Sequence, residues 1–482
     1  MFDKLCRSET LFTAFETTAF PGADLLAFFV SSYLDEFQPV YPIFHMPTFN
    51  LEQSHWILTL TMAAIGSCLI NTPETAGYAY PLQEFARRAI LVEKDKYNTS
   101  TKPVWLIQAM LLNCIGLYHG ADIQAKEYAL GALNDLVSTL AYTVTNFRPL
   151  FSLQDARAPL PSHESLWDAT SEEDWKVMYH GDNVSLHSAI EVLFIEKRSI
   201  PNICEFGHTL LLHALYQRLW EPREAAIPSS PVWLPGVPMY SKWRNSACDC
   251  LDTLHWHANG TIAKAAGFEH PTVLHLHAAR VVLLVPFREI RNLATSLANA
   301  TIPWDSRLER NSDWQHAWRW VNHDQYKARL SMIHAGSVFW HVRRYSTSAF
   351  HEPVSVFLAT LALWAYGICS YNPCSRFSQT ASLPTEARQD QAEDDANPTF
   401  VHLDRPCDDE IVQLFVREGQ TMRGNVTGVG DICSPQGPSK VLKEGVRILS
   451  GLVSTWGITH EYIDILSRLR DCTSLPMTAM TG

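Results

Sequence analysis

Cysteine and histidine are the residue types in this chain that could bind a metal ion. The nearest approach to a zinc finger is the pair Cys248 and Cys250, followed by His255 and His257. A two-cysteine, two-histidine finger needs about two to four residues between its cysteines, about three to five between its histidines, and a loop of about twelve residues between the pairs. All three spacings are shorter here, no two cysteines are separated by two residues, and the six-cysteine binuclear cluster is missing. The sequence therefore predicts no metal site and no zinc cofactor in this chain.

Three further histidines, His270, His275 and His277, follow this pair. In a β-strand, His275 and His277 would point to the same side and could share a metal ion. In the helix predicted for this stretch, their side chains lie about 200° apart around the axis. We therefore expect each histidine to be satisfied by its own neighbours.

Acidic residues could support catalysis instead, because helical isoprenoid synthases hold magnesium with an aspartate-rich DDxxD motif. Asp394–Asn397 lies in a polar stretch, whereas Asp408–Glu410 lacks an acid at the required offset and suits the first turn of a helix. The G-x-S-x-G, H-E-x-x-H and Walker patterns are absent. The sequence predicts no catalytic residue and no enzyme. A helical enzyme or scaffold of unrecognised chemistry is the alternative.

The charge of the chain argues against strong binding to nucleic acid. Its 38 basic and 50 acidic residues give a formal net charge of −12, whereas a domain that grips phosphates usually presents a basic patch. The basic pairs Arg87-Arg88 and Arg343-Arg344 fall within apolar helical patterns and are expected to be solvated or at the edge of the core. We therefore expect DNA contact only through a reader domain missing from this chain or supplied by a partner.

The cysteines of the chain are predicted to be reduced. There are 11 of them, an odd number at irregular spacing, and Cys68, Cys114 and Cys369 lie inside apolar runs. This usage is typical of buried thiols in a reducing compartment rather than of a disulfide framework.

Apolar residues recur at helical spacing along most of the chain, and sustained alternation typical of strands is nearly absent. The predicted fold class is therefore all-α, a large irregular antiparallel helical array with long loops. Its clearest helices are His55–Leu69, Pro81–Tyr97, Val104–His119, Ile123–Tyr142, Pro271–Leu297 and Gln325–Tyr345.

Two stretches near the beginning of the chain, one proline-rich and one uncharged, predict different structures. Pro39, Pro42 and Pro47 forbid a helix, so Gln38–Asn50 is predicted to be extended. Trp56–Pro73 is uncharged and about as long as a short membrane span, but it contains several polar residues and lacks flanking basic ones. We expect a buried helix there and no membrane contact.

Near the end of the chain, Val441, Ile448, Leu452 and Trp456 predict one helix from Ser439 to Trp456, ended by Gly457. The predicted organisation is an N-terminal tail (1–20), a helical domain (21–370), a polar mobile loop (371–400), C-terminal helices that complete the same domain (401–470) and a final tail (471–482).

One proline-containing segment is similar to a known family. Phe37–Phe49, with the sequence FQPVYPIFHMPTF, resembles the F-x-P-x-x-P-I-x-H-x-P-T-F stretch of the fungal-specific transcription factor domain, also called the middle homology region. Leu60–Gly66, Phe85–Arg88 and Gln108–Leu112 resemble the helices that follow it. Phe339–Arg344, His351–Val354, Ala359–Gly367 and the pair Leu166-Trp167 resemble the subfamily that is fused to N-terminal two-cysteine, two-histidine zinc fingers. The resemblance covers roughly residues 21–470.

The resemblance implies a nuclear protein that regulates RNA polymerase II transcription through the transcription machinery, other regulatory proteins or a small-molecule effector. It supplies no catalytic residues, and zinc and DNA binding are expected only of relatives that carry the fingers. Either this chain is a truncated gene model or fragment, or it regulates without its own reader. We expect an effector pocket lined from the helices that carry Phe339, Trp340 and Trp364.

Overall fold

A computed structural model describes residues 20–70, 72, 75, 77–98, 102–145, 159–179, 181, 184–201, 203–226, 238–264, 267–298, 311–370, 399–405, 409–419 and 422–473. The chain divides into two compact units, each built from segments that are distant in the sequence. Unit 1 comprises Met1–Ala225, Thr347–Phe350 and Leu452–His460, and unit 2 comprises Ala226–Ser346, His351–Gly451 and Glu461–Gly482.

The predicted domain boundaries stay predictions. The N-terminal tail (1–20), the polar loop (371–400) and the final tail (471–482) lie almost entirely outside the described residues.

Unit 1 is helical in its described parts. In chain order it contains α2 (Ala23–Ser32), the π-helical turn η1 (Tyr33–Phe37), the short turn η2 (Leu51–Gln53), α3 (Trp56–Leu69), α4 (Ala79–Lys94), α5 (Val104–Tyr118), α6 (Ile123–Thr145), α7 (Glu164–Trp167), α8 (Glu172–Met178), α9 (Leu186–Glu191), η4 (Val192–Glu196) and α10 (Glu205–Ala226).

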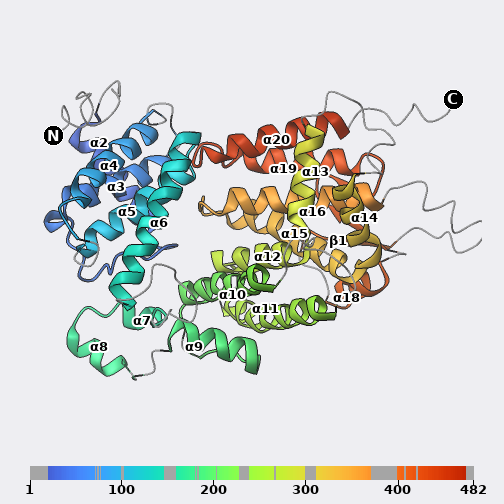
Figure 1. The fold of residues 1–482 in the computed structure, drawn as a ribbon, viewed down its shortest axis with the longest axis horizontal. Helices are drawn as coiled ribbons and strands as arrows, with labels where there is room; N and C mark the ends of the chain where they lie inside the picture. Colours follow the sequence, from blue (N-terminus) through green and yellow to red (C-terminus); the bar gives the residue numbers. More distant parts are fainter. Residues whose placement is uncertain are drawn as a thin grey trace, which may run out of the picture. The chain divides into compact units, whose positions relative to one another are not determined.

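Helix α3 forms the centre of unit 1 and packs against α2, α4 and α5 (Figure 1). It is apolar around almost its whole circumference, and Ile57, Met62 and Ile65 have no exposed surface. The buried helix predicted within Trp56–Pro73 is confirmed. Helix α2 approaches so closely that a Cβ atom on Gly66 would lie 1.8 Å from the carbonyl oxygen of Phe29, so only glycine fits there.

The side chain of Gln38 folds the proline-containing segment that follows η1. Its Nε2 donates to the carbonyl of Phe44 at 2.6 Å, and its Oε1 accepts from the Phe44 amide at 3.3 Å and from the Tyr33 hydroxyl at 3.4 Å. The predicted absence of a helix is confirmed. The predicted extended chain is wrong, because two turns bend this segment. The hydrogen bonds of Gln38 with Phe44 close the first turn, and the Phe49 amide donates to the carbonyl of His45 at 2.9 Å in the second.

Replacing Gln38 with leucine should destabilise unit 1 by about 2 to 3 kcal/mol, because the buried N–H and C=O groups of Phe44 would both lose their partner. The midpoint of urea unfolding, followed by circular dichroism, measures this change. Gln53→Leu is the matched control, since that side chain is exposed, and its effect should stay within about 0.5 kcal/mol. Equal effects of the two substitutions would contradict the role given to Gln38.

Unit 2 is also mainly helical in its described parts. In chain order it contains α11 (Pro238–Lys264), α12 (Pro271–Leu284), α13 (Phe287–Ala298), α14 (Ser312–His323), α15 (Gln325–Tyr345), α16 (Glu352–Ser370), β1 (Thr399–His402), α18 (Asp409–Glu418), β2 (Met422–Val426), β3 (Gly430–Asp431), α19 (Gly437–Ser450) and α20 (Ile458–Thr473), whose first residues belong to unit 1.

The prediction of one continuous helix over Pro271–Leu297 is wrong, because the helix breaks between α12 and α13 at Pro286. Proline has no N–H, and it forces the preceding residue out of helical geometry. Val285 is extended, with φ −108° and ψ 135°. The predicted start is confirmed: Pro271 occupies the first turn, and the side chain of His270 accepts from the Thr272 amide at 3.2 Å.

The predicted range of the last helix is also wrong. Instead of running from Ser439 to Trp456, α19 begins at Gly437 and ends at Ser450. The chain leaves the helix at Gly451, a residue with poor helix propensity, and turns through Leu452–Trp456 before α20 begins. Helix α20 was not predicted at all. The turn takes Trp456 out of α19 and into unit 1.

Helices α15 and α16 pack against each other at the core of unit 2. Within the described part of the chain, α16 is the one helix that is long and apolar enough to cross a membrane, and 78% of the tested window is buried inside the structure. The core helix of a soluble protein meets the same criteria of length and composition, so they are weak evidence for a membrane span.

A small sheet in unit 2 was not predicted. β1 pairs in parallel with β2, starting from Thr399 opposite Met422, and β2 pairs antiparallel with β3. These strands have 4, 5 and 2 residues, too few for an alternating pattern to stand out in the sequence. Elsewhere the described residues form helices and loops, which confirms the predicted all-α class.

Candidate functional site

The three residues predicted to line an effector pocket lie in helices α15 and α16. Phe339 and Trp364 have no exposed surface, and they belong to the packed core of unit 2. Trp340 is partly exposed, and its indole Nε1 donates to Oε1 of Glu269 at 3.0 Å. The structure thus places the three residues on neighbouring helices, and a pocket between them stays a prediction.

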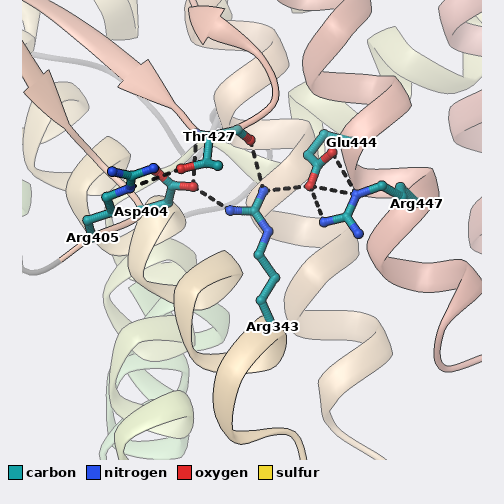
Figure 2. A network of polar contacts seen from close by, with 6 residues as sticks. All are labelled: Arg343, Asp404, Arg405, Thr427, Glu444 and Arg447. Carbon is teal, nitrogen blue, oxygen red and sulfur yellow. Dashed lines mark hydrogen bonds and ion pairs between the residues drawn. The ribbon is translucent and has the colours of Figure 1, made fainter.

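Next to these aromatic residues, Arg343 lies at the centre of a charged cluster in unit 2 (Figure 2). Its guanidinium pairs with Asp404, which follows β1, and its Nη2 donates to Oε1 of Glu444 in α19 at 2.6 Å and to the Thr427 carbonyl at 3.2 Å. The Thr427 amide donates to Asp404 Oδ2 at 2.9 Å. Arg343 therefore connects the end of α15 to the turns of the sheet and to α19.

The burial of this cluster indicates a structural role. The side chain of Asp404 has no exposed surface and that of Glu444 is 9% exposed, whereas Arg447, which also pairs with Glu444, is 63% exposed. Burial raises the pKa of Glu444, but hydrogen bonds from Arg447 and Arg343 outweigh it and hold this pKa below its usual value. A carboxylate that is held by two guanidinium groups is a poor general base, so the cluster is suited to joining elements rather than to proton transfer.

The histidines of α12 point to different neighbours, as the helical prediction required. The Nδ1 atoms of His277 and His334 lie 2.8 Å apart, while the ring of His275 stacks on His351 with centroids 3.7 Å apart. Burial is the main cause that lowers the pKa of both His277 and His334 well below 6.5. Both rings are therefore neutral at neutral pH, and the Nδ1–H of one donates a hydrogen bond to Nδ1 of the other.

A cavity of about 390 Å³ lies within unit 1, among α3, α4, the end of α5, the start of α6 and the returning segment Val453–Gly457. Its wall is mostly apolar and includes Ile70, Leu117, Ala125 and Trp456. The exposed residues Tyr80, Ser454 and His460 mark the rim that faces solvent; further lining comes from Ser67, Cys68, Ala79, Gln83, Gly116, His119, Gly120, Ala121, Asp122 and Thr455.

The returning segment is held against α5 by the backbone. The amide of Ile458 donates to the carbonyl of His119 at 3.0 Å, and the indole of Trp456 donates to the carbonyl of Ser348 at 2.6 Å. A Cβ atom on Gly457 would lie 2.4 Å from the amide nitrogen of Ala121, so a larger residue would push the segment away. This contact forms the cavity wall.

Two buried polar side chains in the wall have incomplete hydrogen bonding. Gln83 is 3% exposed, and its Oε1 accepts from Asn113 Nδ2 at 3.1 Å. Its Nε2 lies where a Cβ atom of Gly116 would be, and its neighbour of acceptor type is the Cys68 thiol, a weak acceptor; it makes no hydrogen bond to an oxygen or nitrogen. Nδ1 of His119 is likewise buried without a partner. Groups of this kind are rare in protein interiors and call for a ligand, an ordered water or a strain explanation.

The unfolding free energy of unit 1 should fall as the pH drops from about 6.5 to 4. Burial, with a smaller effect of Lys126, lowers the pKa of His119 from 6.5 to about 4, so in this range the unfolded chain binds a proton that the folded chain excludes. Between pH 7.5 and 5 this histidine should account for a loss of about 2 kcal/mol.

Urea midpoints of the wild type and of His119→Phe at pH 7.5 and 5 measure the effect. Phenylalanine keeps the ring packing of His119 on Phe350 and Trp456 but binds no proton. The variant should therefore show a smaller loss than the wild type. Identical losses in the two proteins would show that His119 is not excluded from protonation.

Comparison with known protein families gives a match at the beginning of unit 1. Residues 30–131 match the fungal specific transcription factor domain. This segment contains the FQPVYPIFHMPTF motif and every lining residue of the cavity from Ser67 to Ala125. The family resemblance inferred from that motif is confirmed for this part of the chain.

Two curated relatives extend the similarity beyond this segment. A protein named "Transcription factor" from Gibberella fujikuroi is 20% identical over 93% of this chain and 60% of its own length. "Zinc finger protein klf1" from Schizosaccharomyces pombe is 19% identical over 72% of this chain and 51% of its own length. The chain thus spans between one half and two thirds of these relatives. No solved structure matches it.

Sequence reasoning did not single out the cavity residues. One signal for the cavity was available in the sequence: Gln83 lies on the buried side of an amphipathic helix. A buried glutamine needs hydrogen-bond partners, so its position indicates a polar contact or a ligand in the interior. The wall formed by Val453–Gly457 was hidden, because that segment was predicted as the end of a helix more than 300 residues away from α4.

Proposed function

We propose that this chain is the regulatory part of a fungal transcription factor, and that it modulates RNA polymerase II transcription through an effector or a protein partner. The observation that carries the proposal is the match of residues 30–131 to the fungal specific transcription factor domain. The names of both curated relatives, a transcription factor and a zinc finger protein, support a role in transcription regulation.

DNA reading is assigned to a separate domain or partner. The net charge of −12 opposes binding to phosphates, and the cysteine spacing lacks a zinc-finger pattern. We therefore propose that zinc is bound by a finger domain outside this chain, a proposal that the name of the Schizosaccharomyces pombe relative supports. The protein acts in the nucleus, where its contacts are with transcription machinery or other regulatory proteins and not with a membrane.

No enzymatic activity is proposed. The matched family is a transcription factor domain, a class that is typically non-enzymatic. The charged cluster around Arg343 favours this reading, because Glu444 is held by two arginines and Asp404 pairs with Arg343 and the Thr427 amide.

Fusion of the full chain to a heterologous DNA-binding domain tests the proposal. In yeast, we expect the fusion to change expression of a reporter with the matching operator at least about threefold, up or down, relative to the DNA-binding domain alone. Arg447→Ala should keep this effect, and Arg343→Ala, which disrupts unit 2, should lose it. An unchanged reporter, with the fusion abundant and nuclear by immunofluorescence, would overturn the proposal.

A further inference from the structure

We infer that the cavity in unit 1 binds a small uncharged molecule that is largely apolar and carries one carbonyl or ether oxygen as a hydrogen-bond acceptor. The inference deepens the proposed function, since it gives the regulatory domain an effector site. It is nevertheless tested by direct binding, so it can fail while the transcription role stands.

The size and surface of the cavity set the ligand class. A volume of about 390 Å³ falls within the range of about 300 to 1,000 Å³ typical of small-molecule sites. The side chains of Ile70, Leu117, Val453 and Trp456 provide an apolar wall, on which an aliphatic or aromatic body gains contact area. The exposed rim at Tyr80, Ser454 and His460 gives access from solvent.

The charges around the cavity exclude an anionic ligand. Its titratable lining residues are Cys68, Tyr80, His119, Asp122 and His460, and none of its lining residues is lysine or arginine. Burial keeps the Cys68 thiol and the His119 imidazole in their neutral forms. A carboxylate or phosphate entering this site would face Asp122 with no cationic side chain in the lining. Lys126, which acts on His119, and Arg87, which acts on Tyr80, both lie outside the lining, so the desolvation of the anion would be poorly repaid.

The position of the acceptor follows from the unpartnered polar atoms. Gln83 Nε2 can only donate, because an amide nitrogen has no free lone pair, and Gln83 Oε1 is already occupied by Asn113. Nδ1 of neutral His119 can donate as well in the tautomer that carries its proton there. A ligand oxygen that reaches Gln83 Nε2 would give this buried donor a stronger acceptor than the Cys68 thiol, and a hydrocarbon of equal size would not.

Three naphthalene probes of equal ring size test this chemistry on the full chain. 2-Acetylnaphthalene carries a neutral acceptor, 2-ethylnaphthalene has none, and 2-naphthoate is charged. We expect saturable binding of 2-acetylnaphthalene with a submillimolar Kd, about tenfold tighter than either of the other probes, by ligand-detected NMR titration. Tighter binding of 2-naphthoate, or no saturable binding of any probe, would overturn the inference.

Two variants locate the site. Gln83→Leu removes the donor, while Asn113 keeps its hydrogen bond to the Gln83 carbonyl at 2.9 Å. This variant should bind 2-acetylnaphthalene no more tightly than it binds 2-ethylnaphthalene. Ala125→Leu fills the cavity and should abolish binding of all probes with an unchanged or raised melting temperature. Gln108→Leu, on α5 outside the cavity lining, is the matched control and should leave every Kd within twofold.

The variants also separate blocked binding from unfolding. If Ala125→Leu does not fold by circular dichroism, Ala79→Leu on the α4 wall takes its place. Binding that survives both Gln83→Leu and the cavity-filling variant would place the ligand elsewhere and overturn the assignment. Probe binding together with an unchanged reporter in the fusion assay would sustain the cavity site and reject only the transcription role.

Discussion

Replacing Arg343 with alanine should destabilise unit 2 by about 3 to 5 kcal/mol, because it leaves the buried carboxylate of Asp404 without its cation. Asp404 is the sensitive partner: its side chain is fully buried, and its Oδ1 makes no hydrogen bond even in the intact protein. A residual bond from the Thr427 amide cannot neutralise the charge. Chemical unfolding followed by circular dichroism should show this shift in midpoint.

The control is Arg447→Ala, which removes an exposed arginine from the same cluster. Exposed ion pairs contribute about 0 to 1 kcal/mol, so its effect should be several times smaller. The double variant Arg343→Ala/Asp404→Ala should lose less than the sum of its single variants, with a coupling of at least about 1 kcal/mol. Additive losses would mean that Arg343 acts through its alkyl chain or through Thr427 rather than through Asp404.

Acid should weaken the same cluster. The folded pKa of Glu444 lies below its usual value near 4.5, so its pairing stabilises the protein fully above that value and is lost as the pH falls through the lowered folded pKa. The difference in stability between wild type and a Glu444→Gln variant should therefore shrink below about pH 4.5. A difference that stays constant into that range would show that the carboxylate charge is not what Arg343 and Arg447 stabilise.

Replacing Trp364 with alanine should have the second large effect, a loss of about 3 to 5 kcal/mol, because it leaves a cavity in the fully buried centre of α16. Trp364→Phe should cost much less than the alanine variant. Phenylalanine keeps most of the ring, and the indole Nε1 that it removes has no hydrogen-bond partner.

Trp256→Ala is the matched control for Trp364→Ala. This tryptophan of α11 is 80% exposed, so its loss should change the unfolding free energy by no more than about 0.5 kcal/mol. The urea midpoint from far-ultraviolet circular dichroism avoids the fluorescence changes that any tryptophan substitution causes. A large effect at Trp256, or a small one at Trp364, would contradict the burial that the structure gives them.

Helical elements could be predicted where an apolar pattern is bounded by clear stop signals. The sequence predicted Gln325–Tyr345 with the bounds of α15, and Val104–His119 is α5 with one extra residue. Both begin or end beside residues that define a terminus, such as Pro103, the N-cap of α5. Bounds failed where a pattern continued through a break, as at Pro286, because periodicity alone does not register one missing N–H.

The cavity could not be predicted, because its wall depends on long-range packing. Leu452 and Trp456 fit the apolar stripe of α19 by spacing, yet both lie after the end of that helix and are buried in unit 1. Spacing reports which residues are apolar but not which surface covers them. The clustered residues Arg343 and Glu444, which are about one hundred positions apart, present the same difficulty.

The discontinuity of unit 1 has a consequence for biosynthesis. A ribosome that has completed Ala225 must add more than two hundred further residues before Leu452–His460 emerges. At typical translation rates, nascent unit 1 waits roughly 10 to 50 s without the segment that packs on His119 and Ala121. During this interval the nascent chain exposes the apolar wall of the cavity to solvent. We expect chaperones of the Hsp70 type to bind this surface until the final segment has been synthesised.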